Sequence, residues 1–209
     1  MRNKKVRICI MISVLMMISF AAMVDASYSI SEDDTSGYSS VRIDDPYLSF
    51  TVVEADKDDG QIKVGGDHNT PWGPDYCKVD MKMEFTAQED GSISMQADWS
   101  LSWKLETDYQ VGDAKLYIRY VLWSDSSDIE NEVVFYRHVY TPLWGGYESS
   151  HGIENEDDTV SFSSNLSEGT EYAVSVQLHI RLDGEANAWS YSGATNPVSL
   201  DVNEITVWN

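Results

Sequence analysis

The chain has 209 residues and carries 35 acidic against 14 basic side chains, which gives a formal net charge of −21. A surface this acidic repels phosphate backbones, so the composition excludes nucleic-acid binding. The same charge suits solubility, cation binding or a salty environment, and composition does not choose among them.

The first 26 residues have the pattern of a secretory signal peptide. A basic segment ending at Arg7 precedes an apolar run from Ile8 to Met23, and Ala26 closes a small-residue motif of the kind that signal peptidases cleave. Cleavage after Ala26 removes four basic residues and one acidic residue, which leaves 10 basic against 34 acidic side chains. The apolar run is shorter than the roughly 20 residues of a membrane-spanning helix. We therefore expect a secreted or cell-surface protein with no membrane segment after cleavage; a retained signal would instead act as an anchor.

Beyond the signal, the sequence has the alternation of an all-β protein. Residues 27–40 are rich in Ser and Asp with little to bury, so we predict a flexible leader. From residue 41 onward apolar and polar side chains alternate between clusters of turn residues, which is typical of β-strands. The predicted strands are 47–54, 60–64, 76–87, 92–105, 115–123, 132–141, 158–164, 171–182 and 198–207. Since antiparallel strands with one apolar face need a second sheet to cover it, the sequence predicts an antiparallel two-sheet β-sandwich over residues 41–209.

Cys77 is the only cysteine outside the signal peptide, because Cys9 lies within it. No internal disulfide can form, and an odd cysteine in an exported chain can pair between molecules. Cys77 alternates in phase with Val79 and Met81, however, which places it on the apolar face of its strand. We expect a buried free thiol.

The stretch LSEGTEYAVSV, residues 166–176, places Tyr172 directly after a Gly-Thr turn. It resembles the E to F corner of a fibronectin type III or related immunoglobulin-like β-sandwich, in which the tyrosine hydroxyl bonds back to the corner and the ring fills the core. Trp103, Tyr120 and Trp189 resemble, in order, the strand B tryptophan, the strand C tyrosine and the segment before the last strand of that family. A broader immunoglobulin-like or jelly-roll sandwich stays open.

The resemblance covers about residues 76–209. It implies that residues 41–75 form extra strands ahead of the immunoglobulin-like core. It also implies an insertion around 124–160, because the stretch between Trp103 and Tyr172 is longer than the family usually has.

Catalytic motifs are poorly represented. The histidines lack the close ligand spacing of a zinc site, and we expect His138 and His179 to be exposed on strand faces. There is no G-x-S-x-G elbow, and a large number of carboxylates is no evidence for a glycosidase pair. We therefore expect a protein that is not an enzyme.

We expect no cofactor other than calcium. Asp56, Asp58 and Asp59 lie in the acidic segment EADKDDGQI and supply the hard oxygen ligands that calcium prefers. Their spacing departs from the EF-hand register, and a solvated loop is the alternative.

Two groups of aromatic residues stand apart from the predicted core. Trp72, Trp144, Tyr147 and Trp189 lie in segments with turn chemistry, where exposed rings can stack on sugars or anchor a protein partner. The second group lies on strand faces opposite the core side, and we expect the insertion around 124–160 to fold over it. Its members are Tyr117, Val121, Trp123, Tyr136 and Tyr140.

A β-sandwich by itself does not define a function. The leading hypothesis is a non-catalytic exported module that binds another protein or a cell-envelope component. The first alternative is carbohydrate binding through Trp72, Trp144 and Tyr147. The second is a structural spacer stabilised by calcium.

Overall fold

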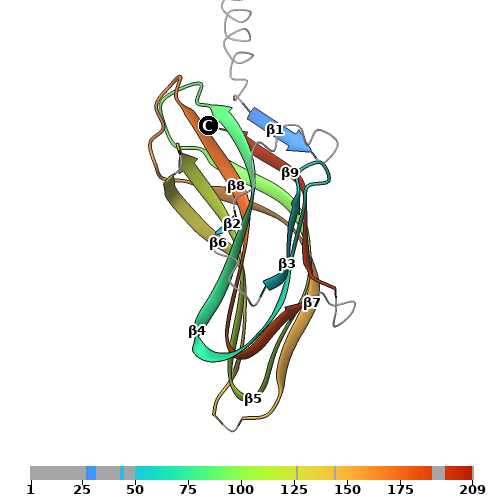
Figure 1. The fold of residues 1–209 in the computed structure, drawn as a ribbon. Coiled ribbons are helices and arrows are strands. Elements are labelled where there is room, and N and C mark those ends of the chain that lie inside the picture. Colours follow the sequence, from blue (N-terminus) through green and yellow to red (C-terminus); the bar gives the residue numbers. More distant parts are fainter. Residues whose placement is uncertain are drawn as a thin grey trace, which may run out of the picture.

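The computed structural model describes residues 27–31, 43–44, 50–125, 127–143, 145–189 and 196–208. The predicted signal peptide and residues 32–40 of the predicted leader lie outside these ranges. The described part is built from strands (Figure 1): β1 (Ser27–Ser31), β2 (Ile43–Asp44), β3 (Phe50–Asp56), β4 (Gln61–Thr86), β5 (Ser94–Ser124), β6 (Ser127–Thr141), β7 (Glu148–Ser161), β8 (Glu171–Trp189) and β9 (Val198–Trp208). Within it, no helix is long and apolar enough to cross a membrane.

The strands form two layers, and every pairing between them is antiparallel. The front sheet contains, in order, β2, residues 75–86 of β4, residues 171–182 of β8, residues 112–124 of β5, and β6. The back sheet contains, in order, β3, residues 61–66 of β4, β9, residues 94–107 of β5, and β7. β1 pairs with residues 204–208 at the C-terminal end of β9. The predicted antiparallel two-sheet β-sandwich is thus confirmed.

One continuous core fills the space between the sheets. Trp99 of the back sheet donates its indole N–H to the hydroxyl of Tyr120 on the front sheet (3.0 Å), and Tyr120 donates to the Ala97 carbonyl (3.0 Å). Phe135 packs edge-on against Trp99 and Trp103, with ring centroids 5.9 and 6.1 Å apart. These contacts tie the two layers together across the core.

The predicted burial of Cys77 is confirmed, and Trp103 and Tyr120, which carry part of the family resemblance, are buried as well. Cys77 is a free thiol, and burial raises its pKa to about 12. The thiol therefore stays protonated and behaves as a small apolar side chain.

The long strands β4, β5 and β8 run through both layers and bend where they pass from one to the other (Figure 1). At the bends the strands approach so closely that only glycine fits at two positions. Gly184 has a φ of +69°, and a Cβ there would overlap the Val111 carbonyl; a Cβ on Gly112 would lie 2.5 Å from the Glu185 carbonyl oxygen. Buried His68 reinforces this junction, because its Nδ1–H donates to the Gly184 carbonyl (2.7 Å).

The corner before β8 contains the hydrogen bond that the sequence predicts. The Tyr172 hydroxyl accepts a bond from the Ser167 backbone N–H (3.1 Å), and its ring packs against Phe85 at a centroid distance of 6.1 Å. Gly169, with a φ of +75°, makes the turn. The assignment to the fibronectin type III family stays a prediction.

Several predicted boundaries are wrong. The strands predicted at 60–64 and 76–87 are one strand, β4, and those at 92–105 and 115–123 are one strand, β5, because the chain bends between sheets without leaving extended structure. The strand predicted at 158–164 begins at Glu148, and residues 27–31 of the predicted leader form β1.

The insertion around 124–160 also differs from the prediction. It does not fold over the outward aromatic residues: its first part forms β6 at the edge of the front sheet, and its second part forms β7 in the back sheet. Both segments find ladder partners on β5, and β-pairing satisfies their backbone groups better than a cover would.

We predict that Tyr120→Phe destabilises the protein more than Tyr172→Phe does. Loss of the buried Tyr120 hydroxyl leaves the Trp99 indole N–H without its acceptor, at a cost of about 2 to 3 kcal/mol. Loss of the Tyr172 hydroxyl leaves the Ser167 backbone N–H without its acceptor, but water can replace it because the bond is exposed, so the cost is about 1 kcal/mol. Urea unfolding of both variants measures the difference, and equal losses would contradict this ranking.

Candidate binding face

The two outward faces of the sandwich differ in chemistry. The back sheet presents small polar and acidic side chains, among them Gln96, Asp98, Asp157, Glu204 and Thr206, which line one shallow hollow. The front sheet presents aromatic and basic side chains from four neighbouring strands. We call this the aromatic face and define it by Tyr76 and Lys78 of β4, His179 and Arg181 of β8, Lys115, Tyr117 and Arg119 of β5, and Tyr136, His138 and Tyr140 of β6.

The register of the front sheet arranges these residues in rows across the strands. Lys78, His179, Tyr117 and Tyr136 are successive cross-strand partners and form the central row. The adjacent row consists of Tyr76, Arg181, Lys115 and His138. Both rows point away from the core because their neighbours in sequence point into it.

The rings of the central row stack on one another. Tyr117 lies between His179 and Tyr136, with centroid distances of 5.2 and 4.8 Å and an interplanar angle of 29° on both sides. Along β6 the series continues from Tyr136 through His138 to Tyr140 at 6.2 and 6.3 Å. Tyr136 and Tyr140 are 42% and 51% exposed, so the face offers ring surface and phenol groups to solvent.

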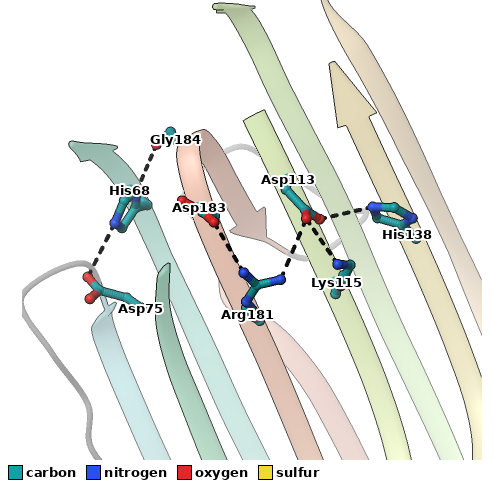
Figure 2. Close-up of polar contacts among 8 residues, drawn as sticks. All are labelled: His68, Asp75, Asp113, Lys115, His138, Arg181, Asp183 and Gly184. Atoms are coloured by element: carbon teal, nitrogen blue, oxygen red, sulfur yellow. Dashed lines mark hydrogen bonds and ion pairs between the residues drawn. The ribbon is translucent and has the colours of Figure 1, made fainter. Parts of the chain in front are cut away.

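Ion pairs fix the second row. Asp113 accepts from Lys115 (3.0 Å) and from the His138 Nε2 (2.9 Å), and it lies 3.5 Å from Arg181. Arg181 also bonds to Asp183 at 3.1 Å, as Figure 2 shows. Exposed pairs of this kind add little stability, but a network of them holds side chains in place.

His179 is a neutral ring at working pH. Burial lowers its pKa to about 3, and the nearby charges of Arg119, Lys78 and Arg181 lower it further. Its Nδ1 atom has no hydrogen-bond partner in the described part of the chain. On the other side of Tyr117, burial and the neighbouring Tyr117 raise the pKa of Tyr136. The Tyr136 phenol therefore keeps its proton and can donate a hydrogen bond.

The end of the face beyond Arg119 is closed by a buried polar network. Asp80 accepts from Ser175 (3.0 Å) and Gln177 (2.9 Å), and the Trp123 indole N–H donates to Ser175 (2.9 Å). Lys82 covers Trp123, with its Nζ 3.6 Å from the ring centroid. This end is therefore packed and offers no open ring surface.

The predicted outward group is thus divided. Tyr117, Tyr136 and Tyr140 lie on the aromatic face, whereas Val121 and Trp123 are buried. Sequence reasoning did not single out Tyr76, Lys78, Lys115, Arg119 and Arg181. Their alternation with core residues gave the signal, but only the strand order shows that they converge.

Of the four aromatic residues predicted on loops, only Tyr147 has a side chain among those that the structure describes, so a platform of these rings stays a prediction. Trp72 and Trp189 have backbones within β4 and β8, not in loops, and their side chains lie outside the described residues, as does all of Trp144. Tyr147 is exposed, and its hydroxyl donates to Glu106, which lies on the outward side of the back sheet. Tyr147 is therefore remote from the aromatic face.

The predicted calcium ligands lie in the exposed turn between β3 and β4. The Asp56 carboxylate accepts from the Asp58 N–H (2.9 Å), and Asp58 pairs with Lys57 (2.6 Å). Among the described residues, Asp59 included, no three His, Cys, Asp or Glu side chains are arranged to hold a metal ion. A calcium site at these residues stays a prediction.

No family model matches the chain, and no curated protein matches it. Among solved structures, the chain is similar to the apo form of the BiXyn10A CBM1 (6% identity, TM-score 0.37, covering 87% of this chain and 96% of that chain). It is also similar to the CBM22-1 xylan-binding domain from Paenibacillus barcinonensis Xyn10C (10% identity, TM-score 0.29, covering 90% and 96%). A third is the carbohydrate binding module CBM6cm-2 from Cellvibrio mixtus lichenase 5A in complex with cellotriose (12% identity, TM-score 0.23, covering 87% and 96%). These likenesses are too distant to bear on function.

We predict that His179 makes the protein less stable as pH falls below its unfolded-state value. The pKa of His179 is about 3 in the folded protein against 6.5 for a free histidine side chain, so between these pH values only the unfolded chain takes up the proton. Stability should fall by up to roughly 1.4 kcal/mol per pH unit from this residue alone. Urea unfolding from pH 7 to pH 4 should show a flatter profile for His179→Asn than for the wild type; parallel profiles would contradict the assignment.

Proposed function

We propose that this protein is a non-catalytic carbohydrate-binding module and that the aromatic face is its binding surface. The observation that carries the proposal is the row of stacked rings formed by His179, Tyr117 and Tyr136, which crosses the strands of an open sheet face. A saccharide presents both C–H surface and hydroxyl groups. The face meets both needs, since its rings are apolar and its phenol, imidazole and guanidinium groups form hydrogen bonds.

The dimensions favour a short oligosaccharide. The row crosses four strands, and neighbouring strands lie about 4.8 Å apart, so the outer two are about 14 Å apart. Stacking and the ion pairs of Asp113 hold the side chains before a ligand arrives. Such preorganisation reduces the entropy lost on binding.

Binding without catalysis is supported by the state of the carboxylates on the face. Asp113 and Asp183 are both in ion pairs with Arg181, and they sit on an open sheet surface instead of in a pocket. A glycosidase acid instead needs a raised pKa in an apolar environment. Export is supported by the signal peptide that the sequence predicts.

A protein partner is the second candidate, and β6 is the observation that favours it. β6 is the edge strand of the front sheet in the described part of the chain. Ile129 and Val133 on this strand are 40% and 44% exposed, in addition to the exposed tyrosines. An edge strand with exposed apolar side chains can pair with a strand of another protein.

A binding assay with a matched control tests the carbohydrate proposal. On a glycan array that includes cell-envelope polysaccharides, the wild type should bind, and Tyr136→Ala should lower the affinity by about tenfold or more, as loss of an aromatic anchor does. Tyr147→Ala removes an equally exposed tyrosine from the back of the molecule and should bind as the wild type does. Binding that survives Tyr136→Ala unchanged would contradict the assigned surface.

The β6 edge is tested with a different substitution. Val133→Pro places a residue that cannot donate a backbone hydrogen bond on the exposed edge strand. If a protein partner pairs with β6, this variant should lose the partner in a pull-down from the native envelope and should keep its glycan binding. Retention of the partner would rule out strand pairing at this edge.

A further inference from the structure

The positive charge of this acidic chain is concentrated on the front sheet. Only 10 basic residues follow residue 26, against 34 acidic ones. Five of these 10 lie on the outward side of the front sheet, on three adjacent strands: Lys78, Lys82, Lys115, Arg119 and Arg181. The same outward side also carries Asp80, Asp113 and Asp183. The hollow on the back sheet is lined by acidic and polar side chains, among them Asp98, Asp157 and Glu204.

Two of these cations are not neutralised by a described carboxylate. Lys115 and Arg181 pair with Asp113, and Lys82 covers Trp123. Lys78 lies 6.0 Å from the Tyr76 ring centroid, and Arg119 lies 5.1 Å from the Tyr117 ring centroid; neither forms an ion pair in the described part of the chain.

Arg119 keeps an unused donor, whereas Lys78 has an acidic residue opposite it on the neighbouring strand. The Nε–H of Arg119 has no acceptor among the described residues. Asp80, the next outward residue after Lys78 on β4, already accepts from Ser175 and Gln177. At the sheet edge, the register places Asp44 of β2 opposite Lys78.

The behaviour of His179 shows where this positive charge acts. Arg119, Lys78 and Arg181 are the three groups whose charges lower its pKa in addition to burial. They therefore lie near one neutral ring at the end of the stacked row, on a chain whose net charge is −21.

We propose that the aromatic face binds an anionic carbohydrate, whose carboxylate or sulfate group lies against Lys78 and Arg119 while its sugar rings contact Tyr117 and Tyr136. This inference rests on the proposed function. Charge complementarity carries it: the acidic remainder of the surface repels a polyanion, which leaves this face as the favourable point of contact. The Arg119 guanidinium, which has no ion pair among the described residues, suits the planar geometry of a carboxylate or sulfate.

The test compares glycans that differ in charge. Isothermal titration at low salt is made with neutral galactan, with polygalacturonate as the carboxylate form, and with a sulfated galactan. The wild type should bind at least one acidic form about tenfold more tightly than neutral galactan. The preference should shrink as salt is added. Which acidic form binds better identifies the anionic group.

Charge variants locate the contact. Lys78→Gln and Arg119→Gln, made singly, should each lower the affinity for the acidic glycan by more than they lower the affinity for neutral galactan, which removes much of the preference. Lys63→Gln makes the same charge change on the back sheet and should keep the preference. If Arg119→Gln proves unstable in a thermal melt, Lys78→Gln decides the matter, since Lys78 lies near the sheet edge.

The outcomes separate the two proposals. Equal affinity for neutral and acidic glycans, unchanged by Lys78→Gln, would overturn the anionic inference and leave carbohydrate binding intact. If polyglutamate binds as tightly as polygalacturonate, the face recognises negative charge without the sugar. That result would also overturn the inference that the ligand is an anionic carbohydrate. If no glycan of either kind binds, the proposed function itself fails.

Discussion

The close contact of the strand bends at Gly112 and Gly184 is the constraint on which the rest of the structure depends. β4, β5 and β8 can serve both sheets only if they turn sharply within extended structure, and the backbone of β5 approaches that of β8 too closely for a side chain. Because β8 continues directly from this junction, its register with β4 and β5 is set there. The rows of the aromatic face inherit that register.

The two sides of each front-sheet strand have different roles, since one side packs in the core and the other forms the surface. Along β5, Leu116, Ile118 and Tyr120 fill the core, while Tyr117 and Arg119 alternate with them on the outside. The inward set satisfies its few polar atoms internally, as the bond from Trp99 to Tyr120 shows. The outward residues of the front sheet present ring surface and two cations, Lys78 and Arg119, that no described carboxylate neutralises. A surface of this kind suits a ligand that is polar, ring-shaped and anionic.

Much of the molecule could be predicted from alternation alone. The all-β class, the burial of Cys77 and Trp103, and the outward position of Tyr136 follow from a period of two, because a strand has only two sides. Loop chemistry misled the prediction at Trp72, since a bend within a long strand uses the same Gly and Pro residues as a turn between two strands.

The sequence by itself therefore determined the all-β class, the apolar sides of the strands and the exceptional acidity of the chain, which are properties of neighbouring residues and of the sum of charges. Only the tertiary structure decided that β8 lies between β4 and β5 and that β6 completes the sheet. That order brings His179 between Lys78 and Tyr117, residues about 100 and 60 positions away in sequence. Alternation fixes the side of a strand on which a residue lies, but backbone pairing between distant segments decides which residues share a surface.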